Sequence, residues 1–365
     1  MHRVSRKQFL AACGATMAAC AAAPRAGAPA EGRSDDVGAA RPTASPVGPP
    51  LEGVTSPAPA WAVLHRSGEL KRRGDALWQR QDRCDLCPRQ CGARRLAGER
   101  GACGANATLE VAAHHPHHGE ERSLSGRQGS GTIFMTHCTL RCVFCINWPI
   151  SQGGEGQRRS LGDLAGMMLS LQRQGCHNIN IVTPTQYAAH VLLALDLAAD
   201  RGLRLPLVYN TSGWERLDVL RLLDGVVDIY LPDIKYAEEA MADRFSPGAG
   251  SYPAVTRAAV LEMHRQVGVA RPGADGLMRR GLMIRHLVMP NGVSGSRNTI
   301  TWIADHLPRD TYLNLMSQYR PEFKARDHPA IARPITRAEY EDAVDWARKA
   351  GLTNLDIQGA GWLSG

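Results

Sequence analysis

Three cysteines in one short run are the residues best suited to chemistry in this 365-residue chain. Cys138, Cys142 and Cys145 form the pattern C-x3-C-x2-C. Three thiolates can bind three irons of a 4Fe–4S cube and leave the fourth iron free for another ligand. An open coordination position is what separates a catalytic metal site from a structural one. The spacing also suits a zinc site whose fourth ligand lies elsewhere, and this alternative stays open on spacing alone.

The cysteine run follows an apolar segment, Gly131 to His137, that is typical of a β-strand. We therefore expect the three cysteines on the loop that leaves the carboxyl end of this strand. In parallel α/β barrels, that end of the strands holds the reacting groups. His137, just before the first cysteine, is expected to be a core residue.

A second group of cysteines precedes the first. Cys84, Cys87, Cys91 and Cys103 form the pattern C-x2-C-x3-C-x11-C, with glycines beside them that allow the backbone to turn close to a metal. Four thiolates at this spacing suit either tetrahedral zinc or a fully ligated iron–sulfur cluster, and the sequence favours neither. Seven of the ten cysteines fall in these two groups, so the sequence does not predict a disulfide framework.

Four histidines lie between the two cysteine groups, in the run His114-His-Pro-His-His118. Pro116 excludes the i, i+4 helical pairing that would bring two histidines onto one metal. We expect this run in a loop before the first barrel strand, as a polar lining near the cysteines rather than a metal site.

After Trp148 the chain alternates between apolar runs and helical patterns, which predicts a parallel sheet curled towards a barrel. The expected strands are 178–183, 205–210, 226–231, 281–289, 312–316 and 353–356. The expected helices are 69–81, 161–174, 188–201, 215–223, one from about 237, 255–267, 299–306 and 337–350. Ser160, Ser212 and Thr336 are the expected helix caps. Polar residues follow successive strands at Thr183, Asn210, Asp233, Asn291 and Gln318, so we expect them to meet at one mouth of the sheet.

The amino terminus has the pattern of an export signal. Ser5 to Leu10 is similar to a twin-arginine motif, and Met17 to Cys20 is similar to a lipoprotein cleavage box. Residues 21–60, rich in Ala, Pro and Gly, predict a disordered linker. Two hypotheses follow. The chain is either exported and lipid-anchored at Cys20, or it is cytoplasmic and carries a non-functional extension. The apolar stretch is too short to span a bilayer.

Charge gives no reason to expect a nucleic-acid partner. The net charge is +8, but aromatic residues are only 5% of the chain, and no basic run is interleaved with aromatics. The apolar fraction of 44% is sufficient for a sizeable core.

Seven segments together resemble the radical SAM superfamily. They are similar to proteins related to pyruvate formate-lyase activating enzyme, and to the subgroup with an N-terminal Cys-x2-Cys-Pro-Arg module. The resemblance extends over about residues 84–358, through the segments 84–89, 129–134, 138–148, 182–185, 209–213, 228–236 and 285–292.

The resemblance implies roles at matching positions. Cys138, Cys142 and Cys145 would ligate a 4Fe–4S cluster whose open iron binds S-adenosylmethionine, with Phe144 beside the adenine. The other implied cofactor-binding residues are Thr183, Thr185, Asn210, Ser212, Asp233, Lys235 and Asn291. Thr183 and Thr185 stand where the superfamily has Gly-Gly-Glu, and Asn210 stands where activating enzymes have the aspartate of a cation site.

By this resemblance the chain is an oxidoreductase that cleaves S-adenosylmethionine reductively, with a flavodoxin- or ferredoxin-like electron donor and a glycyl radical enzyme as its protein substrate. The alternatives are a radical SAM enzyme acting on another peptide or a small molecule, and a noncatalytic iron–sulfur or zinc protein. The expected α/β fold is a partial or full (β/α) barrel over 129–360. A helix and the small four-cysteine metal module precede it at 61–128, after the signal at 1–20 and the linker at 21–60.

Overall fold

The computed structural model describes residues 58–358. The chain divides into Met1–Thr55 and Ser56–Gly365, and every described residue lies in the second part. The expected signal at 1–20 and nearly all of the expected linker at 21–60 lie outside the described residues. No described helix has both the length and the apolar character needed to cross a membrane.

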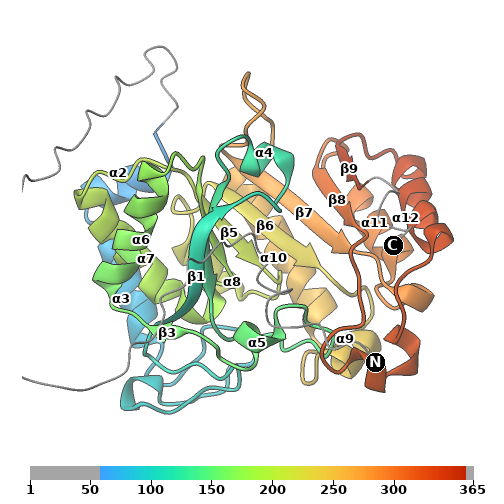
Figure 1. Cartoon of the computed structure of the whole chain (residues 1–365), viewed down its shortest axis with the longest axis horizontal. Coiled ribbons are helices and arrows are strands. Elements are labelled where there is room, and N and C mark those ends of the chain that lie inside the picture. The colour runs from blue at the N-terminus through green and yellow to red at the C-terminus, as the bar shows by residue number, and fades with distance from the viewer. Residues whose placement is uncertain (1–57, 359–365) are drawn as a thin grey trace, which may run out of the picture. The chain divides into compact units, whose positions relative to one another are not determined.

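A nine-stranded mixed sheet forms the centre of the described part (Figure 1). Its spatial order is β3-β1-β2-β4-β5-β6-β7-β8-β9, with parallel pairing from β2 to β9 and antiparallel pairing of β1 with both β2 and β3. The strands are β1 (Glu110–His117), β2 (Ser130–Met135), β3 (Gln157–Arg158), β4 (Ile179–Val182), β5 (Leu207–Thr211), β6 (Ile229–Ile234), β7 (Gly281–Leu287), β8 (Tyr312–Met316) and β9 (Leu355–Ile357).

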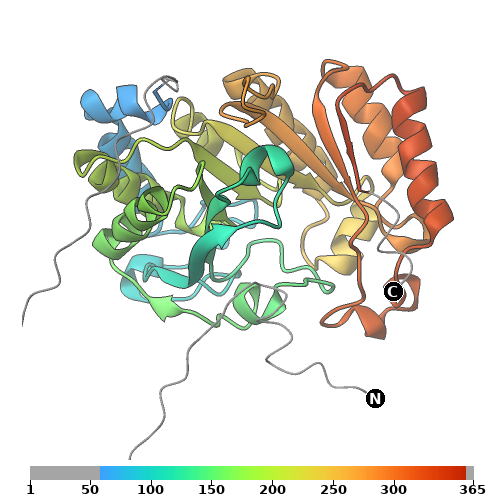
Figure 2. The ribbon, with the colours of Figure 1, turned by 45° about the horizontal axis from the view of Figure 1, so that its top comes forward.

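Eleven α-helices are described. They are α2 (Trp61–Arg66), α3 (Glu69–Gln79), α4 (Arg122–Ser125), α5 (Trp148–Ser151), α6 (Leu161–Arg173), α7 (Ala188–Asp200), α8 (Leu217–Leu222), α9 (Glu239–Phe245), α10 (Tyr252–Val267), α11 (Ser296–His306) and α12 (Arg337–Lys349). In Figures 1 and 2, α3, α6 and α7 lie together on one flank of the sheet, and α11 and α12 lie together on the other. The expected alternation of strands and helices, and with it the α/β class, is confirmed.

The histidine run is part of a strand, so the expectation of a loop there is wrong. β1 pairs antiparallel with β2 along His114 to His117. Pro116 has no backbone N–H to donate, but β3 pairs only with Glu110 and Val111, so the outer side of β1 at Pro116 needs no partner strand. Because proline is tolerated in such edge positions, it did not end the strand.

Two of the three expected helix caps are confirmed. Ser160 and Thr336 each accept a hydrogen bond from the third helical residue, and the Asp163 and Glu339 carboxylates bond back to the cap backbone. Ser212 is not a cap, because α8 begins five residues later at Leu217 with Arg216 at its N-cap. The strand expected at 226–231 is also displaced, since Val226 and Val227 still bond to the Leu223 carbonyl in the turn after α8.

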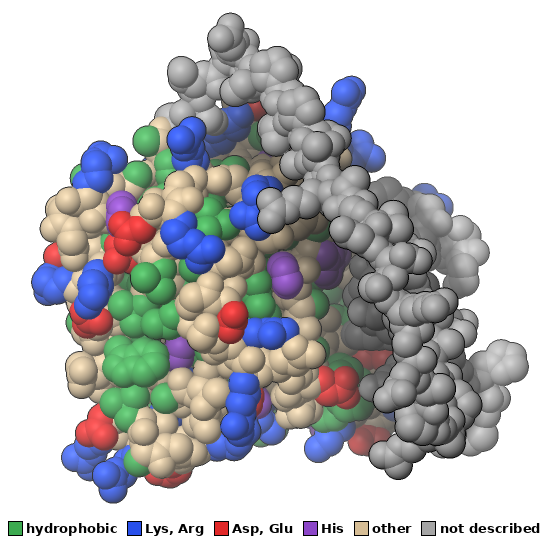
Figure 3. All heavy atoms as spheres, turned by 60° about the vertical axis from the view of Figure 1, so that its left-hand side comes forward, with side chains coloured by type: hydrophobic (Ala, Val, Ile, Leu, Met, Phe, Trp, Pro, Cys, Tyr) green, Lys and Arg blue, Asp and Glu red, His purple; other side chains and the backbone are tan. Residues whose placement is uncertain are grey.

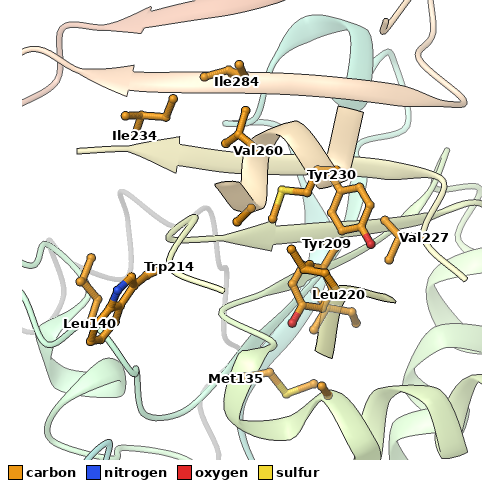
Figure 4. Packing of buried hydrophobic residues seen from close by; sticks show 14 of the residues in the cluster. Met135, Leu140, Tyr209, Trp214, Leu220, Val227, Tyr230, Ile234, Val260 and Ile284 are labelled. Atoms are coloured by element: carbon orange, nitrogen blue, oxygen red, sulfur yellow. The ribbon is translucent and has the colours of Figure 1, made fainter. Parts of the chain in front are cut away.

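Apolar side chains fill both faces of the sheet. The larger core packs between the sheet and its helices and includes Tyr209, Tyr230, Ile234, Val260 and Ile284 (Figure 4). A smaller, separate cluster lies on the opposite face of β5 to β8 and includes Ile229, Leu231, Met283, Tyr312 and, from α4, Leu124.

A row of polar residues crosses four neighbouring strands beside the smaller cluster. Asp233 on β6 is in register with Arg285 on β7, Arg285 with Asn314 on β8, and Asn314 with Asp356 on β9. In-register neighbours on parallel strands point to the same face. These four side chains therefore share the face on which the smaller apolar cluster lies.

The charged side chains of one outer face are mixed in sign. Figure 3 shows Lys and Arg interspersed with Asp, Glu and uncharged side chains on the visible part of the face that comes forward from the left of Figure 1. Within α3, Lys71 pairs with Asp75 at 2.7 Å, and both side chains are exposed. A pair this exposed adds little to stability.

Candidate active site

The three-cysteine loop leaves the carboxyl end of β2, as the sequence predicts. It turns sharply through left-handed backbone at His137 (φ 65°) and Arg141 (φ 57°). The amide of Val143 donates to the Phe245 carbonyl at 2.9 Å, and the Val143 carbonyl accepts from the Lys324 amide at 2.9 Å. The loop is therefore fixed by chain segments that are distant in sequence.

His137 is buried, with 4% of its surface exposed, and its Nε2 lies 2.7 Å from a carboxylate oxygen of Glu110 on β1. This placement agrees with the expected core role. The Cβ of any side chain at Gly104 would come within 2.8 Å of the His137 ring, so the ring also packs against the second cysteine module.

A cavity of about 270 Å³ opens at the carboxyl ends of the parallel strands. All three cysteines of the loop line it. Of the residues expected to bind the cofactor or to gather at this mouth, seven line the same cavity: Phe144, Thr183, Asn210, Ser212, Asp233, Lys235 and Gln318. Residues separated by up to 180 positions in the sequence therefore meet in one place.

The cysteine thiols are largely buried and have hydroxyl neighbours. Ser246 donates to the Sγ of Cys142 at 3.2 Å, and the Ser151 hydroxyl lies 3.2 Å from the Sγ of Cys145. Burial raises the pKa of Cys142 to about 12, and it also raises the pKa of Cys138 and of Cys145, because a thiolate would be poorly solvated there. In the absence of a cation the thiols keep their protons, and a metal would have to displace them.

A buried ionic network forms the wall opposite the cysteines. The Asp233 carboxylate accepts from Arg285 Nε at 2.7 Å and from the Lys235 ammonium. Arg285 also donates to Asn210 Oδ1 at 2.6 Å and lies 3.3 Å from Glu120 Oε2. Burial opposes ionisation of Asp233, but Arg285 and Lys235 outweigh it, so the pKa of Asp233 is below its usual value. Asp233 is therefore ionised and held between two cations.

Glu120 contributes a second, weaker anion. Burial raises its pKa to about 7, although the Arg285 guanidinium opposes that rise. Glu120 follows β1 in the sequence and reaches Arg285 on β7, so it connects the antiparallel edge of the sheet to its centre.

Phe144 supplies an aromatic wall. It is 6% exposed and lies edge-on to Tyr319 and Tyr236, with ring centroids 5.7 Å and 6.2 Å away. Tyr319 also lines the cavity. This cluster leaves an apolar surface beside the thiols, of the kind on which a planar ring can pack.

Two residues of the expected site lie elsewhere. Thr185 is buried beneath the cavity and donates to Glu215 Oε1 at 2.6 Å. Asn291 is exposed and bonds to the Ala330 carbonyl and to Arg333, each at 2.8 Å. The histidine run does not line the cavity either, because His115 and His117 pack on Phe134 along β1, so the expected polar lining there is wrong.

Ser212 lines the cavity because a close backbone contact turns the chain there. A side chain at Gly213 would place its Cβ 2.4 Å from the Asp233 carbonyl oxygen, and the φ of Gly213 is 79°. Tyr252 donates to the Ser212 carbonyl at 2.8 Å. This turn brings the end of β5 against the end of β6.

Several cavity residues were not expected from the sequence. Arg285 is the most important, because it bonds to Asp233, Asn210 and Glu120. A lone arginine inside the apolar run of β7 was the available signal, since a charge in a buried strand requires a partner. Arg141, between two of the cysteines, also lines the cavity and had no pattern to distinguish it.

The second cysteine group forms a compact, mostly irregular module before β1. Cys84, Cys87 and Cys103 are buried, whereas Cys91 is exposed. A Cβ at Gly101 would lie 3.2 Å from Cys91 Sγ and 3.7 Å from Cys103 Sγ, so these two thiols are close together. Burial raises the pKa of Cys87 to about 12, and the charges of Cys103 and Cys84 raise it further.

Arg89 joins this module to the three-cysteine loop. Its guanidinium donates to the carbonyls of Thr139, Leu140 (3.2 Å) and Pro247 (2.9 Å) and lies 5.3 Å from the centre of the Trp214 ring. Figure 4 shows Trp214 beside Leu140. Thr139 and Leu140 belong to the loop that presents the thiols, and Pro247 lies between α9 and α10, so Arg89 ties that loop to a distant segment and helps to set its position.

Thiols, the donors of both cysteine groups, are ligands that zinc and iron–sulfur clusters both take in proteins. All eight cysteines of the described part are free thiols. Within residues 58–358, no three Cys, His, Asp or Glu side chains converge tightly enough to hold a single metal ion. In a 4Fe–4S cube each thiolate binds a different iron, so the three thiols need only surround a shared space. Cys138, Cys142 and Cys145 meet that requirement by lining one cavity.

The fold and site define an α/β protein with a thiol-lined cavity at the carboxyl ends of its strands and a second cysteine module beside it. No model of a known protein family matches the chain. The chain is 31% identical over 284 residues to the uncharacterized protein MJ0674 of Methanocaldococcus jannaschii, over 75% of this chain and 76% of the archaeal one. The chain belongs to the same family as this archaeal protein.

Proposed function

We propose that this protein is a radical SAM enzyme, an oxidoreductase that holds a 4Fe–4S cluster on Cys138, Cys142 and Cys145. The observation that carries the proposal is the meeting of these three thiols with Phe144, Asp233 and Lys235 in one cavity at the carboxyl ends of the strands. A cluster held there would supply one-electron chemistry: with an electron from an external donor, S-adenosylmethionine would be cleaved to methionine and a 5′-deoxyadenosyl radical.

The residues of the chain bind and orient the cofactor. Phe144 offers a flat apolar surface for the adenine. Asp233, paired with Lys235 and Arg285, is a fixed anion suited to the positive groups of the methionine end. Ser246 donates to the Cys142 sulfur, and the Ser151 hydroxyl lies within hydrogen-bond distance of the Cys145 sulfur. Hydrogen bonds to ligating sulfur are one means by which a protein adjusts a cluster.

We also propose that the sheet forms a partial (β/α) barrel. Parallel strands β2 and β4 to β9 follow one another in chain order. Such a sheet, with polar residues gathered at one end, is consistent with a partial (β/α) barrel. The cysteine loop then stands at the barrel mouth, where water can be excluded once a substrate is bound.

The four-cysteine module would hold a second metal centre, zinc or iron–sulfur. Its thiols are free and mostly buried, and Arg89 connects it to the three-cysteine loop. A flavodoxin- or ferredoxin-like protein would supply the electron. We place the enzyme in the cytoplasm, where S-adenosylmethionine and low-potential electrons are found; export followed by lipid anchoring at Cys20 is the alternative.

By resemblance to activating enzymes, the substrate is a glycine in a partner glycyl radical enzyme. The alternatives are another peptide, a small molecule, or a noncatalytic role as an iron–sulfur or zinc protein. Fold alone does not distinguish among them.

The direct test is an assay for 5′-deoxyadenosine after anaerobic reconstitution with iron and sulfide and reduction with dithionite. The wild type should form it, and the triple variant Cys138→Ala, Cys142→Ala, Cys145→Ala should not. Cys176→Ala is the matched control, because Cys176 is a buried free thiol outside both groups. Equal product from the triple variant, or none from a wild type loaded with its cluster, would exclude the radical SAM function.

A further inference from the structure

A second cavity adjoins the thiol-lined one and extends along the polar row of β7 to β9. Its volume is about 180 Å³. Arg285, Met316 and Gln318 line both cavities, so the two share a wall. The two cavities are therefore immediate neighbours.

The charges of this second cavity are unevenly placed. Arg285 lines both cavities and pairs with Asp233 and Glu120. Two further carboxylates, Glu121 and Asp356, line the second cavity. Neither forms an ion pair within residues 58–358. Glu121 is nevertheless near Arg285: burial would lower the pKa of that guanidinium, but Asp233, Glu121 and Glu120 raise it above its usual value. Asp356 accepts a hydrogen bond from the Tyr312 hydroxyl at 2.6 Å.

Two buried acceptors in the same cavity lack donors. Glu121 is 6% exposed and Asn314 is 5% exposed. Asn314 donates to Glu121 Oε1 at 2.9 Å, but Glu121 Oε2 and Asn314 Oδ1 have no hydrogen-bond partner within residues 58–358. A buried carboxylate oxygen and a buried amide oxygen that each lack a donor are costly unless a ligand satisfies them.

We propose that the second cavity is a subsite for an organic cation, a primary ammonium or guanidinium group that binds between Glu121, Asn314 and Asp356. Such a group has the N–H donors that Glu121 Oε2 and Asn314 Oδ1 lack, and its positive charge suits two carboxylates that form no ion pair within residues 58–358. The inference rests on the proposed function in one respect: the cation belongs to the substrate whose reacting carbon lies in the thiol-lined cavity. The substrate class is then a cationic peptide side chain or a small amine.

One feature of the cavity favours the opposite charge. Arg122 is exposed, lines the cavity, and makes no ion pair within the described part of the chain. An anionic ligand would use it and would be repelled by the two carboxylates, so an anionic probe belongs in the test.

The test measures binding of n-butylammonium to the full-length, cluster-loaded protein by saturation-transfer NMR titration, with n-butanol and butyrate as neutral and anionic counterparts. Butylammonium should bind at least tenfold more tightly than either. Glu121→Gln keeps the shape of the side chain and removes its charge, so affinity should fall at least tenfold. Glu341→Gln, an exposed carboxylate on α12, should leave affinity unchanged.

Asp356→Asn provides a second arm if Glu121→Gln fails to fold, and it should also weaken binding. Equal affinity for butanol and butylammonium, tighter binding of butyrate, or unchanged affinity in both variants would overturn the subsite. The assay requires no turnover, so it separates the two proposals. Binding without any S-adenosylmethionine cleavage would leave the subsite standing and remove the radical SAM function.

Discussion

At the scale of single residues, Asp233 has two roles that a substitution can separate. Its carboxylate lies between Lys235 and Arg285, so it neutralises two buried cations as well as facing the cavity. Removing one partner of a buried ion pair leaves uncompensated charge, which is more costly than losing an exposed pair.

We expect Asp233→Asn to weaken S-adenosylmethionine binding while the iron content of the reconstituted protein stays the same. It should also lower the free energy of unfolding by about 3 kcal/mol or more. Equilibrium dialysis, iron analysis and urea unfolding measure the three quantities. Asp224→Asn is the control, since Asp224 pairs with Arg265 on the surface and its loss should cost about 1 kcal/mol at most. Normal binding with reduced stability would assign Asp233 a structural role alone.

Glu215 predicts a pH dependence of stability. It is fully buried, Thr185 and Thr211 donate to it, and burial raises its pKa from 4.5 to about 7. Between those pH values the folded state keeps a proton that the unfolded state loses, so stability falls as pH rises through this range. The loss amounts to roughly 3 kcal/mol and is complete above about pH 7.

Glu215→Gln removes this titration. The unfolding free energy of the variant, relative to that of the wild type, should therefore rise from pH 4.5 to 7 and then stay constant. Urea unfolding of both proteins across this range measures the difference between their unfolding free energies. Asp228 and Glu120 are present in both proteins, so their contributions to the pH dependence cancel in that difference. A constant difference at every pH would show that Glu215 is ionised in the folded protein.

Residue types and spacing predicted that the three thiols would lie on one loop after β2, but they predicted the charged residues of the cavity only in part. Cysteines and strand-end residues such as Asp233 have local patterns. Arg285 was missed because its importance comes from Asp233 on the neighbouring strand, 52 positions away. Thr185 and Asn291 follow strands in the sequence, but a turn after β4 buries one and the turn after β7 exposes the other. Side-chain direction after a strand depends on that turn, which the sequence does not specify.

At the scale of elements, the four-cysteine module should keep its metal independently of the main site. The triple variant at Cys138, Cys142 and Cys145 should still contain about one metal centre, because Cys84, Cys87, Cys91 and Cys103 belong to a separate loop structure. Iron and zinc are both counted by mass spectrometry after anaerobic purification. A metal-free triple variant would show that the module does not bind metal alone.

Arg89, which connects the four-cysteine module to the three-cysteine loop, is expected to restrict the motion of that loop. Arg89→Gln removes the charged donors to the Thr139, Leu140 and Pro247 carbonyls, and each such bond contributes about 1.5–3 kcal/mol. The Val143 and Cys145 amides should then exchange with deuterium roughly ten- to hundredfold faster. Arg83→Gln is the control, an exposed arginine of the same segment. Equal exchange in both variants would show that the loop holds its position without Arg89.

Helix positions were predictable where the apolar periodicity was strong. The helices α6, α7 and α12 each end one residue before the expected end, because their apolar spacing is regular. β1 was missed because the histidine run was expected in a loop, whereas this polar segment is a strand that pairs with β2.

At the scale of the whole molecule, the amino-terminal boundary can be tested by shortening the chain. The sequence placed the start of the folded part near Trp61. The structure moves it earlier, because the Ala60 amide donates to Asp228 at 2.7 Å, and Trp61 is 2% exposed with its indole bonded to the Leu205 carbonyl.

A chain beginning at Ser56 should match full-length stability and S-adenosylmethionine cleavage. One beginning at Gly68 lacks Trp61 and should lose about 3–5 kcal/mol of unfolding free energy. Thermal and urea unfolding of the two chains make the comparison. Equal stability of both would mean that α2 adds nothing to the core.

The contacts of Arg89 also bear on the order in which the protein is assembled. Its three acceptor carbonyls lie 50, 51 and 158 residues further along the chain, so the last contact cannot form until Pro247 has been synthesised and folded. Contacts between distant positions form late, since closing a long loop costs entropy. Under the proposed function, iron and sulfide would reach the thiols of Cys138, Cys142 and Cys145 before this last contact holds the loop in place. Folding of the α9–α10 region would then bury the site, so its metal loading would have to occur before that region folds.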